Sequence, residues 1–177
     1  MAIDRNRTLR GALAGAAAAA VWAAQQPLDR RVFGVPYDDT ELLGKLVTRG
    51  PAWPAVGLAL HLANGALFGA LYANAAPRVP VPAWARGPLA GLVEHAATWP
   101  GTRVTDHVHP AHAELPVLWG DRRALAQATW RHLLFGVVLG EVERRLNPPG
   151  DAAPPMDGET ASTNGHGSIE HLVATSP

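Results

Sequence analysis

The chain of 177 residues contains no cysteine, so it has no disulfide, no thiolate nucleophile and no cysteine-ligated metal site. It is also poor in charge, because Asp, Glu, Lys and Arg make up only 17% of the residues, against roughly 25% in a typical soluble domain. The formal net charge is zero and no basic cluster occurs, so we expect no nucleic-acid partner. The length suits a single domain.

Common catalytic motifs are absent as well. The sequence has no Gly-x-Ser-x-Gly elbow, no phosphate-binding glycine loop followed by lysine, and no metalloprotease helix. Its frequent glycines instead recur at spacings that are typical of helix packing. These absences argue against an enzyme.

The longest distinctive stretch runs between Arg49 and Arg78 without a charged residue. It exceeds the roughly 20 residues that a helix needs to cross a bilayer. Small residues and one histidine recur in it every four positions, which places them on one narrow stripe of a helix. We predict a membrane-spanning helix over 53–76; the alternative is a buried helix of a soluble bundle rich in alanine and glycine.

Three more stretches are predicted to span the membrane, over about 9–28, 84–100 and 122–146. The first follows a basic start, so a secretory signal peptide is its alternative. Asp121 is a good N-cap for the last one. Small residues in all four stretches predict close packing between helices of this chain or, in a homo-oligomer, between copies. These residues are Gly11, Gly15, Gly57, Gly65, Gly69, Gly87, Gly91, Gly136 and Gly140.

The connecting segments have their own patterns. Residues 39–49 predict a short amphipathic helix, which either lies in the membrane interface or folds back over the bundle. Residues 101–121 are expected to form the longest loop. Residues 147–177, rich in Pro, Gly, Ser and Thr, predict a disordered tail. The expected fold is an all-α, four-helix transmembrane bundle over residues 1–146.

Four spans place both chain ends on one side of the membrane. The numbers of Lys and Arg on the two sides are equal, but the first helix usually dominates orientation. Its basic start favours an orientation with both ends in the cytoplasm, and the bilayer is the expected partner.

Five ionisable residues fall inside the predicted spans, where they are costly unless they face a bundle interior and find partners. Helix rise places all five, which are His61, Glu94, His95, Arg131 and His132, in one layer. Three interpretations stay open: a structural layer with Glu94 paired to Arg131, a proton or ion relay through Glu94 and two histidines, and a metal or haem site held by the histidines. We expect His61 to face Glu94, His95 or His132, with Gly65 and Gly69 against a helix backbone.

The loop after the third span carries a second group of histidines. In an extended backbone His107 and His109 point to the same side, and His112 and Glu114 would complete a shell suited to zinc or copper. The alternative is a solvated loop with incidental histidines.

The second half of the chain resembles the YagU-like family of small bacterial inner-membrane proteins, which have no assigned activity. The resemblance covers about residues 57–146. It implies a four-helix inner-membrane protein and draws attention to His95 and His132, without implying a reaction. The residues that carry it are Gly87-Pro-Leu-Ala-Gly-Leu-Val-Glu-His95, Pro100, Glu114-Leu-Pro116, His132 and Glu141-Val-Glu-Arg-Arg145.

Overall fold

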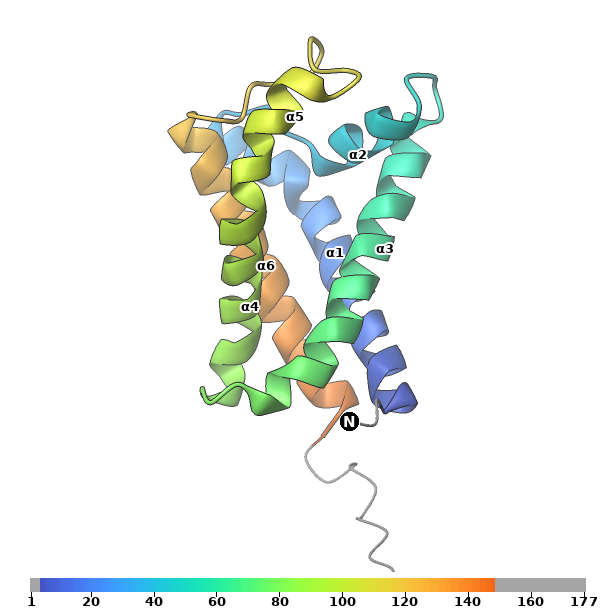
Figure 1. Ribbon diagram of the computed structural model, residues 1–177, viewed down its shortest axis with the longest axis vertical. Coiled ribbons are helices and arrows are strands. Elements are labelled where there is room, and N and C mark those ends of the chain that lie inside the picture. The colour runs from blue at the N-terminus through green and yellow to red at the C-terminus, as the bar shows by residue number, and fades with distance from the viewer. Residues whose placement is uncertain (1–3, 149–177) are drawn as a thin grey trace, which may run out of the picture. The chain divides into compact units, whose positions relative to one another are not determined.

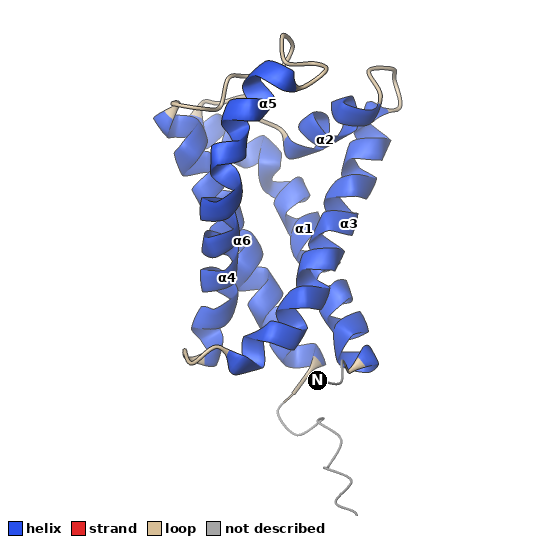
Figure 2. Cartoon of the chain, in the orientation of Figure 1, coloured by secondary structure: helices blue, strands red, loops and turns tan. Residues whose placement is uncertain are grey.

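The computed structural model describes residues 4–148, and the rest of the predicted tail lies outside them. Within these residues the structure is helical without strands, which confirms the all-α class. The elements, shown in Figures 1 and 2, are α1 (Arg5–Phe33), α2 (Asp39–Val47), α3 (Trp53–Ala75), η1 (Ala76–Arg78), α4 (Ala83–Thr98), η2 (Trp99–Gly101), α5 (Thr102–Val108) and α6 (Arg122–Leu146).

The four long helices run alternately up and down, and the short helices α2 and α5 lie together at one end of the bundle (Figure 1). Helix α1 packs against both α3 and α6, α4 packs against α6, and α2 packs against α3. No packing of comparable extent joins α3 and α4. The start of α1 lies beside the end of α6, where Arg7 forms a 2.8 Å ion pair with Glu143.

Glycines set the close approach of the packed helices. A side-chain carbon on Gly15 of α1 would collide with the carbonyl oxygen of Gly65 on α3, and one on Gly87 of α4 would collide with that of Gly136 on α6. At every glycine of the predicted stripes, an added side-chain carbon would lie 3.1 Å or less from an atom of another helix of the chain. The stripe of α3 therefore faces α1 and α2, and it is not free for a second copy.

The ends of α1 differ from the prediction of 9–28. The helix begins after the N-cap Asp4 and continues past Pro27 to Phe33, where Gly34 ends it with a left-handed φ of 69°. Proline removes one backbone donor and normally stops a helix. Here the last turns are held by tertiary hydrogen bonds, since Asp29 accepts from Gln127 at 2.7 Å. The prediction missed this because the partner lies far along the chain.

Part of the predicted loop over 101–121 is helical, which corrects that expectation. Helix α5 occupies Thr102–Val108 and is followed by turns. The carboxylate of Asp106 on α5 accepts the backbone N–H groups of Leu118 at 3.1 Å and Trp119 at 2.8 Å. These contacts tie the helix to the later part of the segment and keep it over the end of the bundle.

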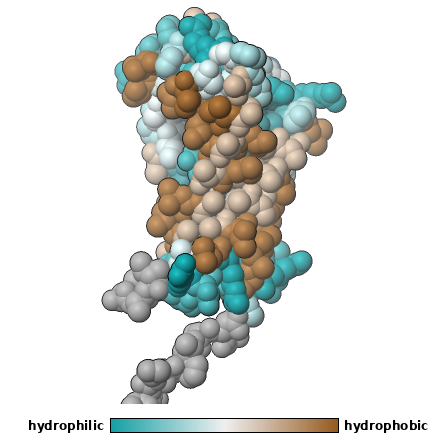
Figure 3. All heavy atoms as spheres, turned by 90° about the vertical axis from the view of Figure 1, so that its right-hand side faces the viewer, coloured by the Kyte–Doolittle hydropathy of each residue, from teal (hydrophilic) through white to brown (hydrophobic). Residues whose placement is uncertain are grey.

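Among the described residues, one stretch, Trp53–Arg78, is long and apolar enough to cross a membrane by its length and composition. Figure 3 views the molecule from the side on which α3 lies in Figure 1. A hydrophobic band covers the middle of this face, and hydrophilic residues cover both ends. On α3 the exposed apolar side chains include Leu58, Leu67 and Leu71.

Candidate functional site

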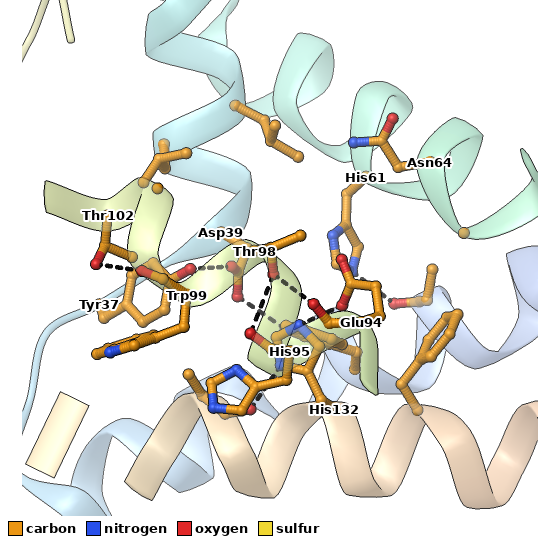
Figure 4. Close-up of a pocket in the computed structure, with 18 of the residues that line it drawn as sticks. Tyr37, Asp39, His61, Asn64, Glu94, His95, Thr98, Trp99, Thr102 and His132 are labelled. Atoms are coloured by element: carbon orange, nitrogen blue, oxygen red, sulfur yellow. Dashed lines mark hydrogen bonds and ion pairs between the residues drawn. The ribbon is translucent and has the colours of Figure 1, made fainter. Parts of the chain in front are cut away.

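A cavity of about 330 Å³ lies among the helices towards α2 and α5. This volume is in the range of small-molecule sites. Residues from all four long helices line it, together with parts of α2, η2 and α5, and its walls carry the aromatic rings of Trp22, Tyr37, Phe68, Trp99 and Phe135. In Figure 4, Tyr37, Trp99 and Thr102 lie at one end of the view, and His61, Asn64 and Glu94 lie at the other.

Glu94 and His132 form the central contact of this cavity. Oε2 of Glu94 on α4 lies 2.7 Å from Nε2 of His132 on α6. The other ring nitrogen of His132, Nδ1, lies 2.7 Å from the carbonyl oxygen of Ala128. A carbonyl oxygen only accepts, so Nδ1 carries a hydrogen, and the Glu94 contact then needs a second proton. For both contacts to be hydrogen bonds, the pair has to share one proton more than a carboxylate and a neutral imidazole hold.

His95 lies beside His132, with their ring centroids 4.6 Å apart. Its Nε2 lies 3.0 Å from the hydroxyl of Thr129, which itself donates to the carbonyl oxygen of Leu125. Nε2 of His95 is therefore the donor, and Nδ1 keeps a lone pair. That Nδ1 atom is buried and has no hydrogen-bond partner.

His61 lines the same cavity as Glu94, His95 and His132. Its Nε2 lies 3.2 Å from the carbonyl oxygen of Ala19 on α1, and its ring contacts Trp22 edge-on at 5.3 Å between centroids. The ring of Trp22 also contacts that of His132 edge-on, with 4.7 Å between centroids. His61 is thus joined to the Glu94–His132 pair through an indole ring and not by a direct hydrogen bond.

Arg131 does not pair with Glu94, which corrects the structural interpretation of the predicted layer. The buried guanidinium binds Asp29 on α1 through two 2.6 Å hydrogen bonds and Asp39 on α2 through one of 2.7 Å. It also donates to the carbonyl oxygen of Tyr37 at 3.0 Å and lies over that ring. This network joins α1, α2 and α6 next to the cavity.

Asp29 and Asp39 were missed from the sequence because both fell in a segment read as a connection. The indole of Trp22 donates to Asp39 at 2.8 Å, and the hydroxyl of Tyr37 donates to the same carboxylate. Burial raises the pKa of Tyr37 well above its ordinary value of 10.0, and the neighbouring Asp39 raises it further. The phenol therefore stays protonated and acts as a fixed donor. The signal for these partners was the buried arginine, which requires carboxylates.

The loop histidines are not gathered around one point. His107 lies on helix α5 and is exposed, as is His112. The ring of buried His109 accepts from the backbone N–H of Ala111 at 3.1 Å, so its other nitrogen donates to the carbonyl oxygen of Leu42 at 3.0 Å. Both nitrogens of His109 are therefore engaged in hydrogen bonds.

Glu114, the fourth residue of that predicted shell, is paired with cations instead. It forms a 2.9 Å ion pair with Lys45 and another with Arg49. Across residues 4–148 no group of three or more His, Asp or Glu side chains is placed to hold a metal ion. The predicted shell is not formed, because α5 turns His107 away and basic residues occupy Glu114.

No family model matches the chain, and neither a curated protein nor a solved structure is similar to it. The resemblance to the YagU-like family therefore stays a prediction.

Proposed function

We propose that the chain is a multi-pass membrane protein without enzymatic activity, whose cavity binds a small solute beside a proton held by Glu94 and His132. The observation that carries this proposal is the 2.7 Å contact between these two side chains on the wall of the cavity. In this geometry the exchangeable proton lies on the wall of the cavity, next to the space that a bound solute would fill. A purely structural pair has no need of an adjoining cavity.

The membrane part of the proposal is supported by the distribution of polarity. Each long helix exposes large apolar side chains, while the interior holds charged ones. A soluble bundle has the opposite arrangement, whereas membrane bundles place ionisable groups inside. Exposed examples from the four helices are Leu13, Leu71, Val93 and Val137, and buried ones are Asp29 and Arg131.

We place the protein in a bacterial plasma membrane with both ends of the membrane domain in the cytoplasm. The even number of long helices brings the start of α1 and the end of α6 to the same end of the bundle. The basic residues before the first apolar run favour the cytoplasm for that end. Association of copies stays a prediction and has to use faces other than the glycine stripes.

Other titratable groups surround the Glu94–His132 pair. The cavity wall carries His95 from α4, His61 from α3 and Asp39 from α2, and Tyr37 from the segment before α2. Arg131 lies behind Asp39 and is neutralised by two carboxylates. None of these groups donates a hydrogen bond to Glu94 in the structure. No hydrogen from another side chain therefore takes the place of the proton between Glu94 and His132.

The proposal is tested by locating that proton at neutral pH in detergent-purified protein. Nitrogen NMR of labelled histidine reports whether both ring nitrogens of His132 are protonated, and infrared spectroscopy reports a protonated carboxyl at Glu94. We expect one of the two signals in the wild type and its loss in Glu94→Gln. Glu141→Gln is the matched control, because Glu141 pairs with Arg144 and Arg145 on the surface of α6. Absence of both signals in the wild type would contradict the proposal.

A further inference from the structure

The threonines of the cavity wall have no free hydrogen to offer a ligand. The hydroxyls of Thr98, Thr102 and Thr105 donate to backbone carbonyl oxygens of their own helical turns at 2.9, 2.7 and 3.2 Å. A hydroxyl has one hydrogen and two lone pairs. Once that hydrogen is used, the side chain can only accept.

The histidine, tryptophan and tyrosine rings discussed next also use their hydrogens for bonds within the protein. His61 and His95 each use Nε2 as a donor within the protein, which leaves Nδ1 of each ring as an acceptor. The hydrogens of Trp22 and Tyr37 both go to Asp39. Among the described residues that line the cavity, Asn64 and Trp99 are the polar side chains that keep an uncommitted donor.

One acceptor stands out. Nδ1 of His95 is buried without a partner, in a side chain that is only 7% exposed. Leaving a buried polar atom unpaired costs free energy. A donor supplied by a ligand in the cavity that His95 lines would remove that cost.

The carboxylates and the aromatic rings around the cavity favour a positively charged ligand. Glu94 uses one carboxylate oxygen for His132 and keeps the other, and the network behind Asp39 joins two carboxylates to a single guanidinium. The indole and phenol rings of Trp22, Trp99 and Tyr37 line the cavity. Aromatic faces attract cations, most strongly when water is excluded.

From these observations we infer that the cavity binds a small organic ammonium ion. Its N–H groups donate to Nδ1 of His95 and to Glu94, and its carbon substituent packs against the aromatic wall. A neutral alcohol lacks the charge, and a carboxylate finds no uncommitted cation among the described residues that line the cavity. This inference rests on the proposed function, for which it names the class of solute.

The ligand series that tests it is benzylammonium, benzyl alcohol, phenylacetate and benzyltrimethylammonium, titrated calorimetrically into the full chain in detergent. The first two differ in charge at nearly equal size, and the last is a cation without an N–H donor. We expect benzylammonium to bind tightest, benzyltrimethylammonium to bind more weakly, and the alcohol and phenylacetate to bind least.

Two variants assign the contact. His95→Phe keeps an aromatic ring but removes the acceptor, so we expect it to weaken benzylammonium binding roughly tenfold or more. Benzyltrimethylammonium makes no hydrogen bond to His95, so we expect its affinity to change much less in the same variant. His107→Phe is the matched control on exposed α5 and leaves both affinities unchanged.

Equal affinity for benzylammonium and benzyl alcohol, or tighter binding of phenylacetate, would overturn the inference in the wild type alone, whether or not His95→Phe folds. Unchanged benzylammonium affinity in folded His95→Phe would overturn it as well. Either result leaves the proton of the Glu94–His132 pair measurable, so failure of this inference is distinct from failure of the proposed function.

Discussion

Nε2 of His132 on α6 lies 2.7 Å from Oε2 of Glu94 on α4, in the wall of a cavity between helices. The backbone of α4 reaches this position because Gly91 allows it to approach the carbonyl oxygen of His132 itself. The packing of two helices and the chemistry of the cavity are therefore set by the same stretch of α4. Variants of the packing glycines and of the polar network test separate parts of this arrangement.

Gly15→Ala should destabilise the bundle by roughly 1–3 kcal/mol, the usual cost of overpacking. The added carbon collides with the carbonyl oxygen of Gly65, so α1 and α3 have to separate. Thermal unfolding in detergent measures the effect. Gly101→Ala is the control, because nothing lies within 4 Å of its added carbon and its φ is −64°. Equal stability of the two variants would contradict the close contact between α1 and α3.

Arg131→Met should cost about 3–5 kcal/mol, because it leaves Asp29 and Asp39 buried without their cation. Chemical unfolding of the purified protein measures this loss. Arg144→Met is the matched control: Arg144 forms an exposed pair with Glu141, and solvent screens such a pair, so we expect little loss of stability. A loss for Arg131→Met as small as that of the control would show that the network is not buried in solution.

The contact between Glu114 and α2 should weaken in acid. Hydrogen bonds from Lys45 and then Arg49 hold the pKa of Glu114 below its ordinary 4.5. Since the folded-state pKa is the lower one, the stabilising contribution is full above 4.5 and is lost as pH falls through the folded value. Lys45 keeps its second partner, Glu41, at 2.7 Å.

Hydrogen exchange of residues 109–121 as a function of pH measures this release. We expect the protection of these amides, relative to the intrinsic exchange rate at each pH, to fall in the wild type as the pH drops below 4.5 and through the lower folded-state pKa of Glu114. Glu114→Gln should show low protection over the whole range, without the acid-dependent step. The same acid step in Glu114→Gln would assign it to another carboxylate, such as Glu41.

Helix positions were largely predictable from the sequence, because uncharged runs and prolines mark them. The structure begins α3 at Trp53 and α6 at Arg122, as predicted, with Asp121 accepting from the N–H of Arg123 at 2.7 Å. Helix α5 was missed because it is short and carries no apolar period. Such helices depend on distant contacts, here those of Asp106 with Leu118.

The site was predictable only in part. The fixed rise per residue of a helix predicted that Glu94, His95 and His132 lie at the same level of the bundle. It did not predict which side chains pair, because the rotation of each helix and the path of the segment before α2 decide which carboxylate meets Arg131. That segment carries Asp39 into the bundle.

The central claim is that the four long helices cross a bilayer, and cysteine labelling tests it most directly because the chain has no native cysteine. Val108→Cys and Arg145→Cys place single exposed thiols at opposite ends of the bundle. In intact cells, a membrane-impermeant maleimide should label Val108→Cys, and Arg145→Cys only after the membrane is opened. Labelling of both positions in intact cells, or recovery of the protein without membranes, would contradict the account.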